Sequence, residues 1–261
     1  MKSLSVQEWS RALQDQDEKA LAQQASALGF AEERKSVANL ILLHDLLNNP
    51  NLLLAIARTA LTTADPDQAL NNLERLANTV PATDLTPILT DDATCRSLLT
   101  VLGASPFLTG ILCRKRDYFI DLFPGRDFFL SKQETDMLAD LQSSIPATAT
   151  FAELQKELRL YKSREVLRIG SRDLCGLASL EEVTGELTAL AAASLQRAVD
   201  VCSQLLNDEY GEPVLEDTEE NEGRSPEFTI FGMGKFGGCE LNFSSDIDLI
   251  YFYTSDPGQT A

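Results

Sequence analysis

Two aspartates near the end of the chain, Asp246 and Asp248, are separated by one residue and stand at the head of an apolar run. Side chains alternate between the two faces of a β-strand, so this spacing predicts that both carboxylates lie on one face. Neighbouring carboxylates repel each other, and a hard divalent cation is the usual reason to place them together. The pair therefore predicts a magnesium site that would serve a phosphoryl or nucleotidyl displacement.

A glycine-rich segment over residues 232–238 precedes this pair and follows a β-rich run. Glycine allows backbone N–H groups to approach phosphate oxygens, so the segment predicts a phosphate-binding turn. Its spacing also matches the Gly-x-Gly-x-x-Gly fingerprint of dinucleotide-binding folds, but residues 238–245 leave no room for the full helix that such folds require. The phosphate loop of nucleoside triphosphatases is excluded as well, because Phe236 follows Lys235.

The segments that must position these motifs are predicted to be mainly helical. Residues 1–150 are typical of a string of amphipathic helices, whose starts are marked by Asn49-Pro50, Asp65-Pro66 and Ser105-Pro106. We expect residues 151–261 to form a second region, in which helices lead into two strands. The predicted fold class is therefore mainly α with a small α+β part.

Within the second region, Ser179 and Glu182 form a capping box at the start of the longest predicted helix. The expected elements are a long helix over 179–206, an acidic loop over 207–225, and strands near 228–232 and 246–253. The acidic loop is interpreted as a solvated connector rather than a docking tail.

Two further patterns have a structural and a functional interpretation. Arg164, Arg168 and Arg172 are four residues apart and predict one stripe on a helix. We favour a solvated face paired with acids, and an anion-facing stripe is the alternative. His44, the one histidine, shares a helix face with apolar residues, which favours a partly buried structural residue and excludes a multi-histidine metal site.

The composition limits the partners and the compartment. The chain has 22 Lys and Arg against 40 Asp and Glu, a formal charge of −18, which argues against general binding of nucleic acid or membranes. Its five cysteines include no C-x-x-C pair, so we expect reduced thiols rather than a disulfide framework. The N-terminus has no apolar signal region, and we expect a cytoplasmic protein.

The run from Gly232 to Ile250, GMGKFGGCELNFSSDIDLI, resembles the signature of the bacterial glutamine synthetase adenylyltransferase/adenylyl-removing enzymes. These enzymes belong to the polymerase-β-like nucleotidyltransferase superfamily. Residues 105–123 and 163–183 resemble the N-terminal half of the same family. The resemblance implies two nucleotidyltransferase domains joined by a regulatory helical region.

In this family, the half nearer the N-terminus removes AMP from a tyrosine of glutamine synthetase by phosphorolysis, which gives ADP. The C-terminal half adds AMP from ATP, and the PII signalling protein and glutamine set the balance. Because this copy of the motif follows a helical region, the resemblance implies the adenylyl-removing half. It also implies Mg²⁺ as cofactor, ATP, ADP and phosphate as substrates or products, and glutamine synthetase and PII as partners.

Carried over to this sequence, the resemblance makes Asp246 and Asp248 catalytic metal ligands. The implied nucleotide- or phosphate-binding residues are Gly234, Lys235, Gly237, Gly238 and Ser245. The resemblance also implies that residues 151–261 are the beginning of a nucleotidyltransferase domain that is incomplete at its C-terminus. The family's third metal-binding carboxylate is expected past Ala261, so we expect an N-terminal fragment that is inactive by itself. The alternatives are a non-catalytic helical regulatory or interaction module, or a nucleotidyltransferase of another substrate.

Overall fold

The computed structural model describes residues 5–123, 125–215, 226–254 and 258–260. The chain divides into two compact units. Unit 1 consists of Met1–Leu130 and Gly170–Leu177, and unit 2 of Ser131–Ile169 and Ala178–Ala261. Helices dominate and the few strands pair antiparallel, which confirms the predicted fold class.

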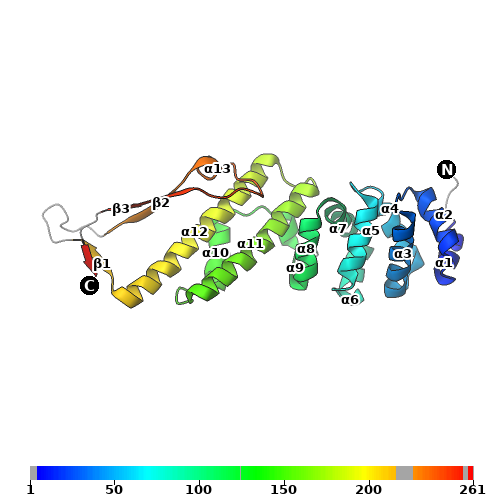
Figure 1. Ribbon diagram of the computed structural model, residues 1–261, viewed down its shortest axis with the longest axis horizontal. Coiled ribbons are helices and arrows are strands. Elements are labelled where there is room, and N and C mark those ends of the chain that lie inside the picture. Colours follow the sequence, from blue (N-terminus) through cyan, green and yellow to red (C-terminus); the bar gives the residue numbers. More distant parts are fainter. Residues whose placement is uncertain (1–4, 124, 216–225, 255–257, 261) are drawn as a thin grey trace. The chain divides into compact units, whose positions relative to one another are not determined.

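Unit 1 is a succession of short helices, drawn in blue to green in Figure 1. They are α1 (Val6–Gln14), α2 (Glu18–Leu28), α3 (Glu33–Leu47), α4 (Pro50–Ala60), α5 (Pro66–Ala77), α6 (Ala82–Thr90), α7 (Asp92–Ala104), α8 (Pro106–Arg114) and α9 (Arg116–Leu122), with a 3₁₀ turn at Arg126–Phe129.

The predicted helix starts of unit 1 are confirmed by their caps. The side chains of Asn49, Asp65 and Ser105 accept hydrogen bonds from the backbone N–H three residues on, at 3.1, 2.9 and 3.2 Å. In each case proline occupies the first helical position, where its missing N–H costs nothing. Local sequence therefore sets where α4, α5 and α8 begin.

The core of unit 1 forms where α5 packs against α3 and α7. Leu70 and Leu73 on α5 are fully buried, and Asn72 donates to the carbonyl of Leu102 on α7 at 2.8 Å. Burying each such leucine stabilises the fold by about 1.5–3 kcal/mol. His44 on α3 is also buried, in keeping with a structural role.

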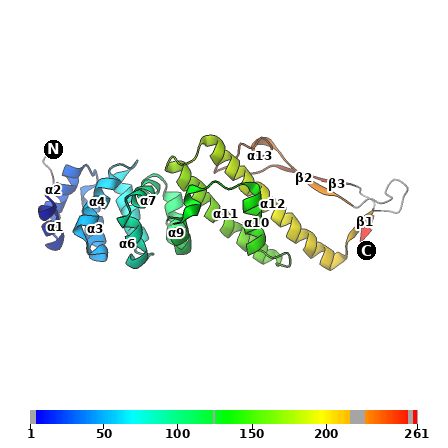
Figure 2. The same cartoon turned by 180° about the vertical axis from the view of Figure 1, so that it is seen from behind.

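Unit 2 is built on α10 (Glu134–Ser144), most of α11 (Phe151–Leu174) and α12 (Leu180–Tyr210). Figure 2 shows these helices from behind, in green and yellow. The Ser179 hydroxyl accepts a hydrogen bond from the N–H of Glu182 at 3.2 Å, which confirms the predicted N-cap. Helix α12 is longer than the predicted range of 179–206: it continues through Asp208 and Glu209, which were expected in the acidic loop, and ends at Tyr210. Residues 216–225 of that loop lie outside the described residues.

The strands form two antiparallel pairs. β1 (Pro213–Leu215) pairs with β4 (Gly258–Thr260), and β2 (Phe228–Gly232) pairs with β3 (Leu249–Tyr253). The second strand was predicted to start near residue 246, and this start is wrong. The last paired position is Gly232 with Leu249, because the chain turns away from the strand after Gly232 and leaves residues 246–248 with no partner strand.

A buried ion cluster joins the helices of unit 2. The Arg168 guanidinium donates to Glu165 at 2.7 Å and to Glu186 of α12 at 2.6 Å, and all three side chains are at most 3% exposed. The Lys132 ammonium lies 3.3 Å from Glu165, and its backbone N–H donates to Glu186 at 2.8 Å. Burial alone would lower the pKa of Arg168, but the two carboxylates outweigh it and raise that pKa.

This cluster corrects the favoured interpretation of the arginine stripe. Arg168 and Arg172 are each 2% exposed, so the stripe is not a solvated face. The expected pairing with acids is confirmed for Arg168. Because its donors are engaged by carboxylates, Arg168 does not present itself to a phosphate either.

No single described helix is long and apolar enough to cross a membrane; α7 and α8 meet the length and composition only as a pair, which is bent by 116°.

Candidate functional site

The glycine turn, residues 232–238, follows β2 and contains a single turn of helix, α13 (Gly234–Gly237). Gly234 has a φ of +54°, in the left-handed region that side chains with a Cβ rarely adopt. The N–H groups of Gly237 and Gly238 donate to the carbonyls of Met233 and Gly234, at 3.2 and 3.0 Å. The turn is therefore held by its own backbone, and the short helix agrees with the exclusion of a dinucleotide-binding fold.

A glycine is also needed at the first position of the turn. A Cβ at Gly232 would overlap the ring of Phe236, which packs back over the end of β2. A Cβ at Gly237 would press into the carbonyl oxygen of Gly232. Close packing within the turn thus explains two of its glycines, while Gly234 is explained by its backbone conformation.

The carboxylate segment, residues 241–248, carries both aspartates in an exposed stretch without regular secondary structure before β3. The backbone carbonyl of Asp248 accepts a hydrogen bond from the N–H of Met233 at 2.8 Å, which ties the segment to the glycine turn. The Asp248 carboxylate faces this turn, because its Oδ2 lies 4.0 Å from where a Cβ would stand at Gly234. The structure therefore brings Asp248 and Gly234 together.

The placement of Asp246 is less constrained by regular structure. The same-face prediction assumed a strand, and the strand begins only at Leu249. Asp246 is exposed and is among the residues around a cavity of about 530 Å³, together with Ser245 and Ile247. Leucines of α12, among them Leu187 and Leu190, line the other side. That the two carboxylates share a face stays a prediction.

Ser245 and Lys235, both predicted to lie near phosphate, differ in their availability. The Ser245 hydroxyl donates to the Asn242 side-chain oxygen at 2.9 Å, and its N–H donates to the Asn242 carbonyl at 3.1 Å. Both donors of Ser245 are thus used inside the carboxylate segment. Lys235 is exposed on α13, and its carbonyl accepts from the N–H of Glu240 at 2.8 Å. A phosphate role for either residue stays a prediction.

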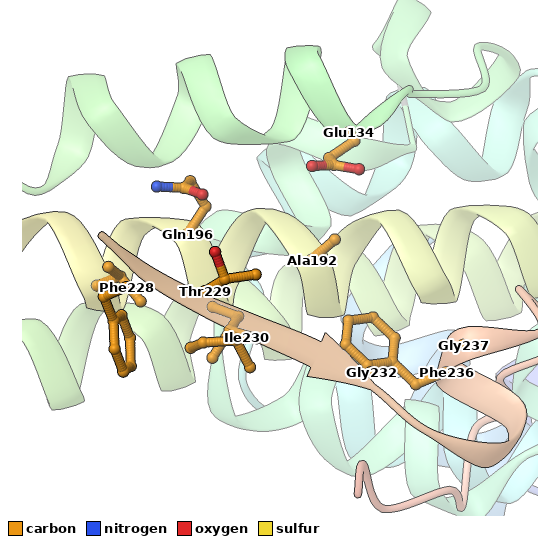
Figure 3. Close-up of a pocket in the computed structure, with 11 residues that line it drawn as sticks. Glu134, Ala192, Gln196, Phe228, Thr229, Ile230, Gly232, Phe236 and Gly237 are labelled. Atoms are coloured by element: carbon orange, nitrogen blue, oxygen red, sulfur yellow. The ribbon is translucent and has the colours of Figure 1, made fainter. Parts of the chain in front are cut away.

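A second cavity, of about 400 Å³, is lined by residues of β2, α12 and the glycine turn (Figure 3). Gln196 and Ala192 of α12 line it together with Thr229 of β2, and Glu134 contributes a carboxylate from the start of α10. Phe236 and Gly237 also line this cavity, so the glycine turn forms part of its wall. The residues from α10, α12 and β2 were not anticipated, since these elements are far apart along the chain.

The chemistry of the acidic pair suits a hard divalent cation. Mg²⁺ prefers carboxylate oxygens and keeps several waters, so one or two carboxylates can hold it. Among the described residues, no group of three or more His, Cys, Asp or Glu side chains could hold a metal ion. Asp246 and Asp248 fit the type of ligand but supply only part of a coordination shell.

Two residues near the aspartates were missed by sequence reasoning. Asn242 organises the backbone just before Asp246, and Thr188 of α12 contacts Leu241 at the start of the carboxylate segment. Asparagine and serine are common turn residues, so the sequence Asn242-Phe243-Ser244-Ser245 could have predicted this turn. Thr188 gave no such signal, because it lies 53 residues away along the chain.

A scan against protein families supports the resemblance over much of the chain. The family described as glutamate-ammonia ligase adenylyltransferase matches residues 95–261, which include the glycine turn and the carboxylate segment. Residues 5–94, with α1 to α6, precede the matched range.

Curated relatives carry the name bifunctional glutamine synthetase adenylyltransferase/adenylyl-removing enzyme. The protein from Thioalkalivibrio sulfidiphilus is 35% identical over 159 residues, 61% of this chain and 16% of the relative. That from Shewanella loihica is 38% identical over 181 residues, 69% of this chain and 18% of the relative. The protein from Psychromonas ingrahamii is 33% identical over 187 residues, which are 72% of this chain and 19% of the relative. The chain thus aligns with less than a fifth of each of these relatives.

Proposed function

Because this chain belongs to the glutamate-ammonia ligase adenylyltransferase family, we propose that its glycine turn and carboxylate segment form part of a nucleotidyl-transfer site that acts on glutamine synthetase. One observation carries the proposal. Within the matched range, Gly234 has a positive φ and the Asp248 carboxylate lies beside it, an arrangement that supports a phosphate-binding turn next to a ligand for a cation.

The proposed reaction is removal of AMP from a tyrosine of glutamine synthetase by phosphorolysis. An oxygen of inorganic phosphate attacks the phosphorus of the tyrosyl-AMP diester, the bond from phosphorus to the tyrosine oxygen breaks, and that oxygen takes up a proton. ADP is the second product. The resemblance of the motif, which here follows helices, favours this direction over the addition of AMP from ATP.

The residues of this chain would act mainly by positioning and charge, as phosphoryl transfer requires. Asp246 and Asp248 would hold Mg²⁺, which when bound neutralises charge on the phosphates. This neutralisation is needed, because an anion at Gly234 would otherwise lie beside the Asp248 carboxylate. In the part of the chain that the structure describes, the N–H groups of Gly234 and Lys235 have no hydrogen-bond partner and could donate to phosphate oxygens.

The first test is nucleotide binding by this chain. ADP is titrated calorimetrically with Mg²⁺ and again with a chelator. We expect binding that needs Mg²⁺ and is lost in Asp246→Asn, without change in the circular dichroism spectrum. Asp173→Asn, an exposed acid in unit 1, removes the same charge and is expected to bind like the wild type.

The second test is the reaction itself. In a longer chain that carries this segment, Asp246→Asn should abolish phosphate-dependent release of ADP from AMP-modified glutamine synthetase. Unchanged release would refute the assignment. Activity with another AMP-modified protein, but not with glutamine synthetase, would instead favour a nucleotidyltransferase of another substrate.

A helical interaction module is the second candidate, because unit 1 forms a compact unit of its own. In this case the chain would bind glutamine synthetase or PII through its helices. A pull-down with each protein separates the candidates: capture by both wild type and Asp246→Asn, with no Mg²⁺-ADP affinity in the wild type, favours the module.

A further inference from the structure

The carboxylate segment is attached to α12 at its first residue, Leu241. This leucine is 4% exposed, and its N–H donates to the Thr188 hydroxyl oxygen at 3.5 Å. Thr188 is itself 9% exposed and donates its own hydroxyl proton to the carbonyl of Thr184 at 2.8 Å. Since that proton is engaged within α12, the oxygen lone pairs of Thr188 are left to accept from Leu241.

Asn242 then fixes the next residues. Its side-chain oxygen accepts from the N–H of Ser244 at 3.2 Å and from the hydroxyl of Ser245 at 2.9 Å. Its own N–H donates to the Ser245 hydroxyl oxygen at 3.3 Å. This closed set of hydrogen bonds ends immediately before Asp246, so the direction in which the chain enters the acidic pair depends on it.

The far end of the segment is held independently. The Asp248 carbonyl accepts from the Met233 N–H at 2.8 Å. The support on the α12 side is also firm, because Glu186, two residues before Thr188, belongs to the buried ion cluster. The two aspartates therefore lie between one attachment to α12 and one to the glycine turn.

We propose that Thr188 and Asn242 are positioning residues for the Asp246–Asp248 pair, a role that rests on the function proposed above. Neither residue touches the reacting groups. Thr188 holds the start of the carboxylate segment against α12, and Asn242 sets the turn from which Asp246 emerges. Together they fix the separation of the two carboxylates before a cation binds, which is preorganisation of the site.

The test uses the whole chain and three substitutions on one helix. Thr188→Val removes the hydroxyl at nearly constant volume, Thr188→Ser restores it, and Thr184→Val is the matched control one turn earlier. Within the described part of the chain, the Thr184 hydroxyl donates to the Glu181 carbonyl of its own helix, at 3.3 Å, and makes no other hydrogen bond. Amide hydrogen exchange over residues 241–248 and the affinity for Mn²⁺ alone, measured by electron paramagnetic resonance, are the readouts.

We expect Thr188→Val to accelerate exchange at Leu241 and its neighbours by roughly two- to tenfold, the range for one lost hydrogen bond. Mn²⁺ affinity should fall in parallel while the urea midpoint stays close to that of the control. Thr188→Ser should restore both readouts. For Asn242, the substitution Asn242→Ala should accelerate exchange at Ser244 and Ser245, and Asn242→Asp, which keeps the acceptor oxygen, should restore protection.

The outcomes separate this proposal from the proposed function. Equal exchange in Thr188→Val and Thr184→Val, or failure of Thr188→Ser to restore protection, would overturn the positioning role. Absence of Mn²⁺ binding in the wild type, with exchange behaving as expected, would instead overturn the metal site and leave the attachment to α12 established.

Discussion

The buried ion cluster of unit 2 offers the sharpest test of the fold. Arg168→Met replaces the guanidinium by an apolar side chain of similar length and leaves two carboxylates, Glu165 and Glu186, in positions that are at most 3% exposed. Removing one partner of a buried ion pair costs about 3–5 kcal/mol, because the remaining charge is uncompensated.

The structure places the expected loss at the lower end of that range. Lys132 remains 3.3 Å from Glu165, and its backbone N–H still donates to Glu186 at 2.8 Å, so neither carboxylate is left alone. We therefore expect the free energy of unfolding to fall by about 3 kcal/mol. With a urea slope of about 2 kcal/mol per molar, the midpoint should fall by about 1.5 M.

The assay is urea unfolding at pH 7 followed by circular dichroism, with Arg164→Met as the matched control. Arg164 lies one turn earlier on α11 and is only half-buried, so its loss should change the midpoint little. Adding Glu165→Gln to Arg168→Met removes one of the two buried negative charges that then share only part of their former compensation, and it should recover part of the stability. A loss below about 1 kcal/mol for Arg168→Met, or no recovery in the double variant, would refute the reasoning.

Three further predictions follow from the same structure. Burial, followed by the charges of Glu165 and Asp140, raises the pKa of the Tyr161 hydroxyl above its usual 10.0. As the pH rises above 10, the unfolded state therefore loses the hydroxyl proton before the folded state does, and the free energy of unfolding decreases. In urea titrations at increasing pH, this decrease should be shallower for Tyr161→Phe than for the wild type. Gly234→Ala should cost about 1–2 kcal/mol through its positive φ alone, whereas Gly237→Ala, whose Cβ meets a carbonyl, should lose more in thermal melts; equal losses would contradict this distinction. Leu70→Ala on α5 should lower the unfolding free energy by about 2–5 kcal/mol, and a loss like that of an exposed residue would show that the core of unit 1 is misplaced.

Local signals in the sequence were sufficient for much of the helical part. Asn49, Asp65 and Ser105 each precede a proline and act as caps, because capping involves only the first turn of a helix. The start of α12 followed from Ser179 for the same reason. Its end did not, because the acidic residues 208 and 209 are compatible with a helix as well as with a loop.

The candidate site could be located from the sequence but not assembled from it. The glycine turn and the acidic pair are close along the chain, and the need for glycine at residue 234 follows from its left-handed backbone. The start of β3 was missed because strand pairing depends on where the partner strand ends, and β2 ends at Gly232. The alternation of apolar and polar side chains in the sequence does not show where the partner strand ends.

The order of residues by itself determined the helix starts, the fold class and the run from Gly232 to Ile250 that carries the family relationship, since all of these depend on neighbours within a few turns or on the motif itself. Only the tertiary structure decided that Arg168 is buried between Glu165 and Glu186, and that Thr188 contacts Leu241. The physical reason is that burial and hydrogen bonding between distant segments depend on which helix faces pack together. Sequence periodicity shows that one face of a helix is polar, but it does not show which residues of another helix that face will contact.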